Sequence, residues 1–337
     1  MSRLGWSLAA AGAALAAVPA LVLLRGHGPT APVGGVAAAT VTPAPKQAAP
    51  AVISGLRVLD EDFSFTASPR APRNPPVVHA AASILVDPDT GRILWQQSAR
   101  TRLAPASTVK LLTALVTLEN FDTARAVTVT PDALQLEWDE SKMGLQPGNT
   151  LTIGELLTGL LTVSANDAAN ALADDTVGMT RFVEAMNEQA LALGLRDTHV
   201  VSPVGLDDPA TYSTAYDLAV LASADVEHFP LLRDIVSTQY TVLPATATHP
   251  AFDLNNINLL LRMYPAATGI KTGYTGNAGG CEIGMAERDG HRLIDVILNG
   301  DYVYSTSKRL LDWGFTQEGL PSQLPPSPSP SPSPQAH

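Results

Sequence analysis

Three observations predict an α+β domain with a helical insertion in this chain of 337 residues. Runs rich in β-forming residues lie at residues 82–96 and again at residues 267–300. Between them, apolar residues recur at helical spacing. Strands at both ends of a region with helices in its middle are typical of α+β architectures.

Each expected element has a local reason in the sequence. The β-rich runs 82–86 and 92–96 flank "DPDTG", whose turn residues predict a hairpin near one edge of a sheet. Residues 267–300 are expected to form two strands around a glycine-containing loop, and residues 126–134 to begin as a short alternating strand. Apolar spacing together with start and stop residues predicts helices at 111–118, at 151–178 as a pair joined at 163–165, at 179–195 with a stop at Gly194, at 212–224 and at 307–315.

Both ends of the chain differ in composition from its centre. Residues 4–24 follow Arg3 and carry no charge, and as a helix they would reach about 30 Å, enough to cross a bilayer. We expect a signal peptide or an uncleaved signal anchor there, and either would export the rest of the chain. The expected organisation is a signal peptide or anchor at 1–25, an extended Pro/Ala-rich tether at 26–76, the folded domain at 77–316 and a disordered Pro-Ser tail at 317–337.

The bulk composition argues against several classes of function. The net charge of −11 and the pI of about 5.0 disfavour nucleic acid as a partner and leave no strong basic patch for anionic lipid. Membrane contact is therefore expected only through the N-terminal segment. The single cysteine, Cys281, cannot form an internal disulfide or a cysteine-based zinc site. There is no His-Glu-x-x-His motif and no glycine-rich phosphate loop, so we expect neither a metal nor a cofactor.

A serine and a lysine three residues apart open the apolar helix in "APASTVKLLTALV". Ser107 would lie in the first helical turn, where free N–H groups and the helix dipole stabilise negative charge. Lys110 would share its face, and burial would lower the pKa of that lysine enough for it to deprotonate the serine. A capping serine beside a solvated lysine explains the same pattern. Ser305 and Lys308 have this spacing too, so the motif alone decides nothing.

Two further segments change this interpretation. Ser164 and Asn166 form a Ser-x-Asn motif where two helices are expected to join, although a plain helix cap would look similar. Lys271, Thr272 and Gly273 form a Lys-Thr-Gly motif on an expected strand, where an edge lysine is the simpler explanation. In the order Ser-x-x-Lys, Ser-x-Asn, Lys-Thr-Gly, the three motifs match the set of penicillin-binding proteins and class A β-lactamases.

The sequence resembles the D-alanyl-D-alanine carboxypeptidases, the low-molecular-mass penicillin-binding proteins. Blocks such as "PASTVKLLTAL", "LTIGELLTGLLTVSANDAANALA", "SPVGLDDPATYSTAYDLAVLA", "TGIKTGYTGNAGGC" and "LLDWGF" resemble family blocks and follow the family order. The resemblance implies a serine β-lactamase-like α+β fold: an antiparallel sheet flanked by helices, with a mostly helical second lobe. It assigns residues 77–316 to a penicillin-sensitive carboxypeptidase domain that acts on peptidoglycan and forms an acyl-enzyme.

The resemblance also implies catalytic roles. Ser107 would attack the carbonyl between two terminal D-alanines, with Lys110 as general base, and Ser164 would relay a proton to the leaving amine. An acyl-enzyme formed in this way divides one difficult reaction into two easier steps. The implied partners are a stem peptide that ends in D-Ala-D-Ala and the β-lactams, which mimic it.

The remaining motif residues would bind the substrate. Asn166 would hold its amide, Lys271 would maintain the electrostatics of the cleft, and Thr272 would bind the terminal carboxylate. Gly273 would let the substrate approach the strand, and the N–H groups of Ser107 and Tyr274 would form the oxyanion hole, since a developing oxyanion needs fixed donors.

Two positions depart from the family pattern. Ala165 stands where the motif set has an aspartate. Related carboxypeptidases often carry an arginine ten residues before the tryptophan of "WGF", where it supports carboxylate recognition. Ten residues before Trp313 this chain has Val303. Carboxylate binding would then depend on Thr272 and Lys271, or activity would be weaker.

The sequence leaves other functions of this fold open. A β-lactamase would need a glutamate followed by x-x-Leu-Asn for fast deacylation, but Glu188 is followed by Gln-Ala-Leu-Ala. A non-catalytic penicillin-binding or wall-associated module would tolerate Val303, although the intact motifs argue against it. An endopeptidase that cleaves peptide cross-links would use the same residues.

Overall fold

The computed structural model describes residues 56–59, 63–69 and 71–325. The signal peptide or anchor expected at residues 1–25 lies outside the described residues, as does the end of the Pro-Ser tail. Among the helices of the described part, none has the length and apolar character needed to span a bilayer.

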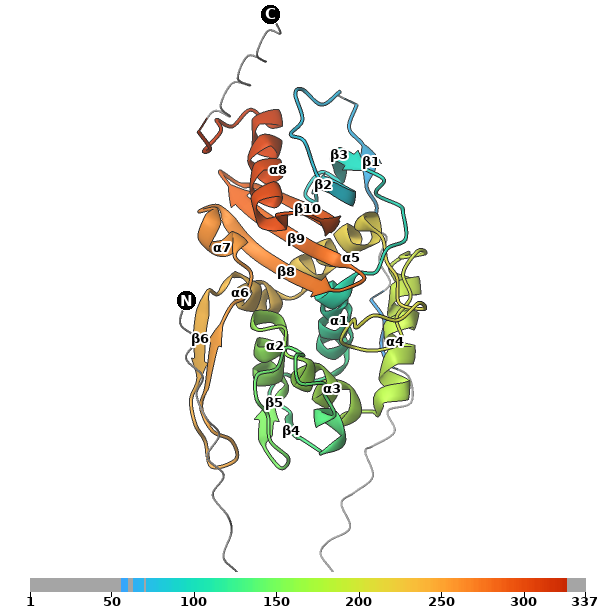
Figure 1. The fold of residues 1–337 in the computed structure, drawn as a ribbon, viewed down its shortest axis with the longest axis vertical. Helices are drawn as coiled ribbons and strands as arrows, with labels where there is room; N and C mark the ends of the chain where they lie inside the picture. The colour runs from blue at the N-terminus through green and yellow to red at the C-terminus, as the bar shows by residue number, and fades with distance from the viewer. Residues whose placement is uncertain (1–55, 60–62, 70, 326–337) are drawn as a thin grey trace, which may run out of the picture. The chain divides into compact units, whose positions relative to one another are not determined.

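A six-stranded sheet organises the domain (Figure 1). All of its neighbouring strands pair antiparallel except the two-residue strand β1, which runs parallel to β3. The expected α+β fold is therefore confirmed, and β2 and β3 form the expected hairpin near one edge. In sheet order the strands are β1 (Thr66–Ala67), β3 (Arg92–Gln97), β2 (Ala80–Asp87), β10 (His291–Gly300), β9 (Gly279–Arg288) and β8 (Ala267–Thr275).

The prediction of two strands in residues 267–300 is wrong, because this segment forms three: β8, β9 and β10. Asp289 and Gly290 join β9 to β10, and their φ angles are 49° and 81°. A two-residue hairpin turn of this kind needs positive φ at both central positions, which Asp-Gly adopts readily. β10 also pairs with β2, so it connects the two ends of the domain's sequence within one sheet.

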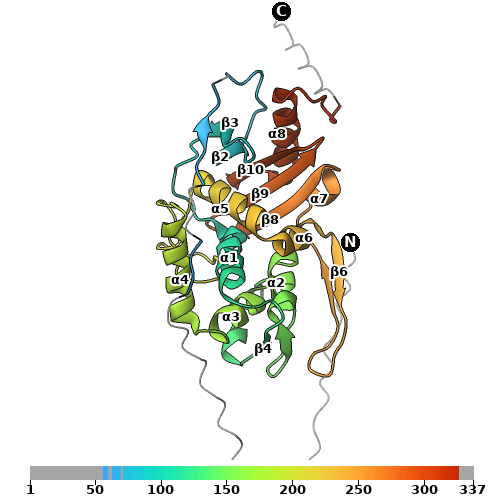
Figure 2. The ribbon, with the colours of Figure 1, turned by 180° about the vertical axis from the view of Figure 1, so that it is seen from behind.

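Two helices cover opposite faces of the sheet (Figures 1 and 2). α5 (Ala215–His228) contacts β2 and β10, whereas α8 (Val303–Gln317) contacts β9 and β10. Thr214 caps α5 by accepting a hydrogen bond from the backbone N–H of Asp217. These two helices correspond to those expected at 212–224 and 307–315.

The core residues of β2 alternate between the two faces. Ile84 and Val86 belong to the apolar cluster that includes α5, while Leu85 packs in the cluster that contains Leu311 and Phe315 of α8. Successive side chains of a strand point to opposite faces, so a central strand covered on both sides is apolar throughout. This explains why Ile84, Leu85 and Val86 form an uninterrupted apolar run within β2.

A mostly helical lobe lies beside the sheet, as expected (Figure 1). Its helices include the predicted pair joined at 163–165 and the predicted helix that stops at Gly194, whose φ is 72°. The sequence did not predict the short elements β5, β6, β7, α6 and α7. The elements of this region are the 3₁₀ turn η1 (Ala106–Val109), α1 (Lys110–Asn120), β4 (Ala126–Thr128), the 3₁₀ turn η2 (Asp132–Leu134), β5 (Thr150–Thr152), α2 (Ile153–Thr162), α3 (Asn166–Asp174), α4 (Met179–Ala192), α6 (Pro230–Ser237), β6 (Tyr240–Leu243) and β7 (Phe252–Asn255). The short helix α7 (Leu260–Met263) packs instead against α8 and β8.

The folded unit extends beyond the expected boundaries at residues 77 and 316. Phe65, within the expected tether, is buried, and its backbone N–H donates to the Tyr216 hydroxyl over 3.0 Å. At the other end, Arg288 donates to the carbonyl oxygen of Pro321 over 2.7 Å. Single residues of the Pro-rich segments, such as Phe65 and Pro321, therefore make contacts with the folded domain.

We predict that Phe182→Ala lowers the free energy of unfolding by about 3–5 kcal/mol, because it leaves a cavity under α4, where Phe182 is fully buried. Leu191→Ala on the same helix is the matched control, since Leu191 is 71% exposed and its truncation should cost no more than about 0.5 kcal/mol. Denaturant unfolding of the full-length chain measures both values. Equal losses for the two variants would contradict the assigned packing.

Candidate active site

Ser107 and Lys110 lie at the start of the predicted helix. The 3₁₀ turn η1 leads into α1, so Ser107 has helix N-terminal N–H groups beside it. Lys110 is fully buried, and its Nζ lies 2.9 Å from Ser107 Oγ and 2.8 Å from the carbonyl oxygen of Val204. Burial lowers the pKa of Lys110 well below 10.5, and the positive charge of Lys271 lowers it further. A neutral amine at this position can accept the proton of the serine hydroxyl.

A second buried lysine approaches the same site from β8. Lys271 Nζ donates to Ser164 Oγ over 2.9 Å and to the carbonyl oxygen of Thr272 over 2.7 Å. Burial lowers the pKa of Lys271 to about 7, and the opposing influence of Glu282 is smaller. Ser164 has a φ of 59°, an uncommon conformation that directs its hydroxyl from the junction of α2 and α3 toward β8. The structure thus brings together all three sequence motifs.

Two glycines allow the chain to approach the turn that holds Ser107. A Cβ atom at Gly273 would lie 2.8 Å from the backbone nitrogen of Ser107. Gly205 has a φ of 79°, and a Cβ there would lie 2.1 Å from the carbonyl oxygen of Ala106. Gly273 therefore keeps the space in front of the Ser107 N–H open, and Tyr274 follows it on β8 with an exposed side chain.

Asn166 and Asp167 hold a loop against the start of α3. The backbone N–H of Asn166 donates to the carbonyl oxygen of Ser141 over 2.8 Å. The buried carboxylate of Asp167 accepts hydrogen bonds from three consecutive backbone N–H groups, those of Met143, Gly144 and Leu145, over 2.9–3.0 Å. Charged acceptors make stronger hydrogen bonds than neutral ones, so this loop is fixed relative to the Ser-x-Asn motif.

Thr272 points toward the N-terminus of α8. Its Oγ1 is 2.9 Å from the hydroxyl of Tyr304, which directly follows Val303. Val303 is buried against Gly280 and Gly300, so the position of the missing arginine is filled by packing. Sequence reasoning missed Tyr304 because no motif links it to Thr272, although its place beside Val303 gave a hint.

Cys281 takes no part in this chemistry. It is fully buried on β9, and burial raises the pKa of its thiol to about 11. A thiol with so high a pKa is a poor nucleophile at neutral pH. The serine hydroxyl beside Lys110 is thus the better candidate for nucleophilic attack.

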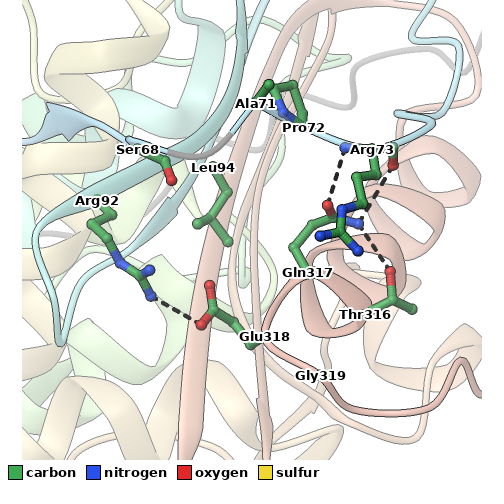
Figure 3. Close-up of a pocket in the computed structure, with 10 residues that line it drawn as sticks. All are labelled: Ser68, Ala71, Pro72, Arg73, Arg92, Leu94, Thr316, Gln317, Glu318 and Gly319. Carbon is green, nitrogen blue, oxygen red and sulfur yellow. Dashed lines mark hydrogen bonds and ion pairs between the residues drawn. The ribbon is translucent and has the colours of Figure 1, made fainter.

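A cavity of about 480 Å³ lies elsewhere, between the segment before β2 and the end of α8 (Figure 3). None of the motif residues lines it. Its charged and amide groups bond to one another: Arg92 pairs with Glu318 over 2.9 Å, and Gln317 accepts from the backbone N–H of Arg73 over 3.1 Å. These contacts attach the N-terminal segment to α8. The polar residues that line the cavity therefore have a structural role.

Comparison with known proteins identifies the family to which this arrangement belongs. A family model described as D-alanyl-D-alanine carboxypeptidase matches residues 69–302, a range that includes all three motifs. The chain belongs to the D-alanyl-D-alanine carboxypeptidase family. Its resemblance to this family and its expected fold are both confirmed.

Relatives and solved structures agree with this family. The D-alanyl-D-alanine carboxypeptidase DacF of Bacillus subtilis is 32% identical over 280 residues, which cover 79% of this chain and 70% of the relative. A Mycobacterium tuberculosis D-alanyl-D-alanine carboxypeptidase structure superposes with a TM-score of 0.68 at 35% identity, covering 76% of this chain and 97% of that one. A Streptomyces DD-transpeptidase structure also gives 0.68, at 30% identity, covering 72% of this chain and all of that one.

We predict that Asp167→Ala lowers the free energy of unfolding by about 3 kcal/mol, since it leaves three backbone N–H groups without their charged acceptor. Hydrogen exchange at residues 143–145 should accelerate in this variant. Asp139→Ala, an exposed acid of the same loop, serves as the control and should change the stability by less than about 0.5 kcal/mol. Unchanged exchange at residues 143–145 would refute the role of Asp167.

Proposed function

We propose that this chain is a penicillin-sensitive serine D-alanyl-D-alanine carboxypeptidase of the cell wall. The observation that carries the proposal is the buried Lys110 amine within 2.9 Å of Ser107 Oγ at a helix N-terminus. Family membership supports the substrate class, because the relatives are named for D-alanyl-D-alanine cleavage. Stem peptides that end in D-Ala-D-Ala are the proposed substrate, and β-lactams are the proposed inhibitors.

The reaction proceeds through an ester on Ser107. Ser107 Oγ attacks the carbonyl carbon between the two D-alanines while Lys110 Nζ takes the hydroxyl proton. The N–H groups of Ser107 and Tyr274 stabilise the oxyanion. Ser164, hydrogen-bonded to Lys271, passes its proton to the departing amine and receives the proton that Lys110 took from Ser107, and D-alanine leaves. Water then attacks the ester, which releases the shortened peptide and returns a proton to Ser107.

Substrate binding involves the residues around this centre. Asn166 holds the amide on the acyl side of the scissile bond, and Thr272, beside Gly273 on β8, receives the terminal carboxylate. Lys271 supplies positive potential when protonated, and its pKa of about 7 makes this charge pH-dependent near neutrality. Because Val303 replaces a cation, the hydroxyls of Thr272 and Tyr304 take a larger share in carboxylate recognition.

The β-lactamase alternative finds no support in the position of Glu188. Its carboxylate pairs with Arg181 over 3.0 Å on the surface of α4, where it is half exposed. A deacylating glutamate must reach the ester on Ser107, and an α4 surface ion pair offers no such contact. The non-catalytic module differs from the proposed enzyme only in turnover, so an activity measurement separates the two.

We further propose that the enzyme acts outside the cytoplasm. The apolar residues 4–24 support export by a signal peptide or a membrane anchor. Intact mass measurement of the mature protein distinguishes the two, since cleavage removes about 2–4 kDa from a segment of signal-peptide length.

We predict that the wild-type chain releases D-alanine from a peptide ending in D-Ala-D-Ala and is labelled covalently by fluorescent penicillin. Ser107→Ala should lose both activities, because Ser107 supplies the only hydroxyl that is hydrogen-bonded to the buried amine of Lys110 among the described residues. Ser305→Ala is the matched control, as it disrupts the second Ser-x-x-Lys pattern, and it should keep both. Labelling of Ser107→Ala would show that the nucleophile is another residue, whereas labelling of the wild type without D-alanine release would favour the binding module.

The acylation rate should fall as the pH is lowered, because Lys110 accepts a proton only as the neutral amine. Burial has lowered the pKa of Lys110, so the rate should level off well below pH 10.5. Lys110→Arg, whose side chain stays protonated, should reduce acylation by about 10²–10⁴-fold. Penicillin labelling rates between about pH 5 and pH 10 provide the measurement. A rate that keeps rising to the highest pH would contradict a depressed lysine pKa.

A further inference from the structure

An acidic side chain from another loop lies against Asn166. Glu140 Oε2 accepts a hydrogen bond from Asn166 Nδ2 over 2.5 Å, and Glu140 Oε1 accepts from the backbone N–H of Glu137 over 3.0 Å. None of the motifs in the sequence contains Glu140, and the proposed mechanism does not use it. Its position beside the Ser-x-Asn motif nevertheless puts a carboxylate in the substrate cleft.

The loop that carries Glu140 is held in place directly after this residue. Ser141, the next residue, accepts the backbone N–H of Asn166, and Asp167 holds the loop a few residues further on. Glu140 therefore cannot leave the cleft without breaking buried hydrogen bonds. A carboxylate constrained in this way has a fixed relation to a bound substrate.

The contact with Glu140 uses one of the two N–H donors of the Asn166 side-chain amide. Asn166 is 3% exposed, its Nδ2 donates to Glu140, and its Oδ1 is buried without a hydrogen-bond partner. In the proposed function, Asn166 must donate to a carbonyl on the acyl side of the scissile bond. The second N–H of Asn166 Nδ2 remains available to the substrate, so Glu140 and a bound acyl group meet at the same amide.

The surroundings of Glu140 favour a cation. Among the residues that the structure describes, no side chain forms an ion pair with its carboxylate. The neighbouring exposed residues are Glu137, Trp138 and Asp139, with Lys142 as the one base, and Trp138 is 87% exposed. A carboxylate that has no cationic partner is a favourable environment for an ammonium group. Lys110 Nζ bonds to Ser107 and Val204 instead of forming an ion pair with Glu140, although the negative charge of Glu140 raises the pKa of Lys110.

We propose that Glu140 is a specificity residue that selects peptides carrying an ammonium group on the acyl side of the scissile bond. The ammonium pairs with the Glu140 carboxylate, while the second N–H of Asn166 Nδ2 donates to the substrate carbonyl. A diamino acid with a free side-chain amine has the required chemistry. This inference rests on the proposed function and adds a substrate preference to it.

The test compares two peptides that differ only in this charge. D-alanine release is measured for acetyl-L-lysyl-D-Ala-D-Ala, whose side-chain amine is free, and for the same peptide with that amine acetylated. The wild-type kcat/KM should be about tenfold higher for the free amine, the range of a close charge pair at a binding site. Glu140→Gln should bring the ratio to about one, because the amide keeps the shape of the side chain but not its charge.

Glu137→Gln is the matched control, since it removes the same charge from the same loop without touching Asn166. It should keep the wild-type ratio. The wild type offers a second measurement that needs no variant: added salt should reduce the preference for the free amine, because partly exposed charges are screened.

The outcomes separate this inference from the proposed function. Equal kcat/KM for the two peptides in the wild type, or equal effects of Glu140→Gln and Glu137→Gln, would overturn the role of Glu140 and leave the carboxypeptidase intact. Absence of D-alanine release from both peptides would overturn the proposed function and the specificity with it. A wild-type preference that collapses only in Glu140→Gln supports the proposal.

Discussion

Burial of two lysines in one cleft is the constraint on which the rest of the site depends. An ammonium group loses hydration when it is buried, so the pKa of Lys110 falls and its amine becomes available as a base. That environment cannot come from α1 alone. The carbonyl of Val204 and the hydroxyl of Ser107 supply hydrogen-bond partners, and Lys271 on β8 adds a repulsive charge. The contact between the helical lobe and the sheet therefore produces the chemistry as well as the fold.

Glycine positions determine how closely these parts meet. Gly273 and Gly205 both touch the turn that holds Ser107, one from the sheet and one from the loop before α5. A side chain at either position would push the nucleophile away from the strand or from the Val204 carbonyl. The same residues that close the cleft also leave the Ser107 N–H accessible, so packing and oxyanion stabilisation have a common origin.

Much of this arrangement could be predicted from local sequence, but contacts between distant loops could not. Short stretches of neighbouring residues predict the "DPDTG" turn, the helix stop at Gly194 and each of the three motifs. The structure agrees with the predicted turn and the predicted helix stop. The Asp289–Gly290 turn carries an equally local signal, the Asp-Gly pair that favours a two-residue hairpin turn. By contrast, Glu140 meets Asn166 and Tyr304 meets Thr272 only through folding, and no spacing rule connects these pairs. The Pro-rich sequence around Phe65 likewise gives no local signal that this side chain is buried against the domain.

The burial of Cys281 has a practical consequence for studies of this molecule in solution. It is the only cysteine in the chain, and its thiol is inaccessible and held protonated. A cysteine introduced on the surface would therefore be the one reactive thiol, without removal of the native residue. Fluorophores or spin labels attached on the loop of Glu140 and on α8 could then report whether the two sides of the cleft change their separation when a peptide binds.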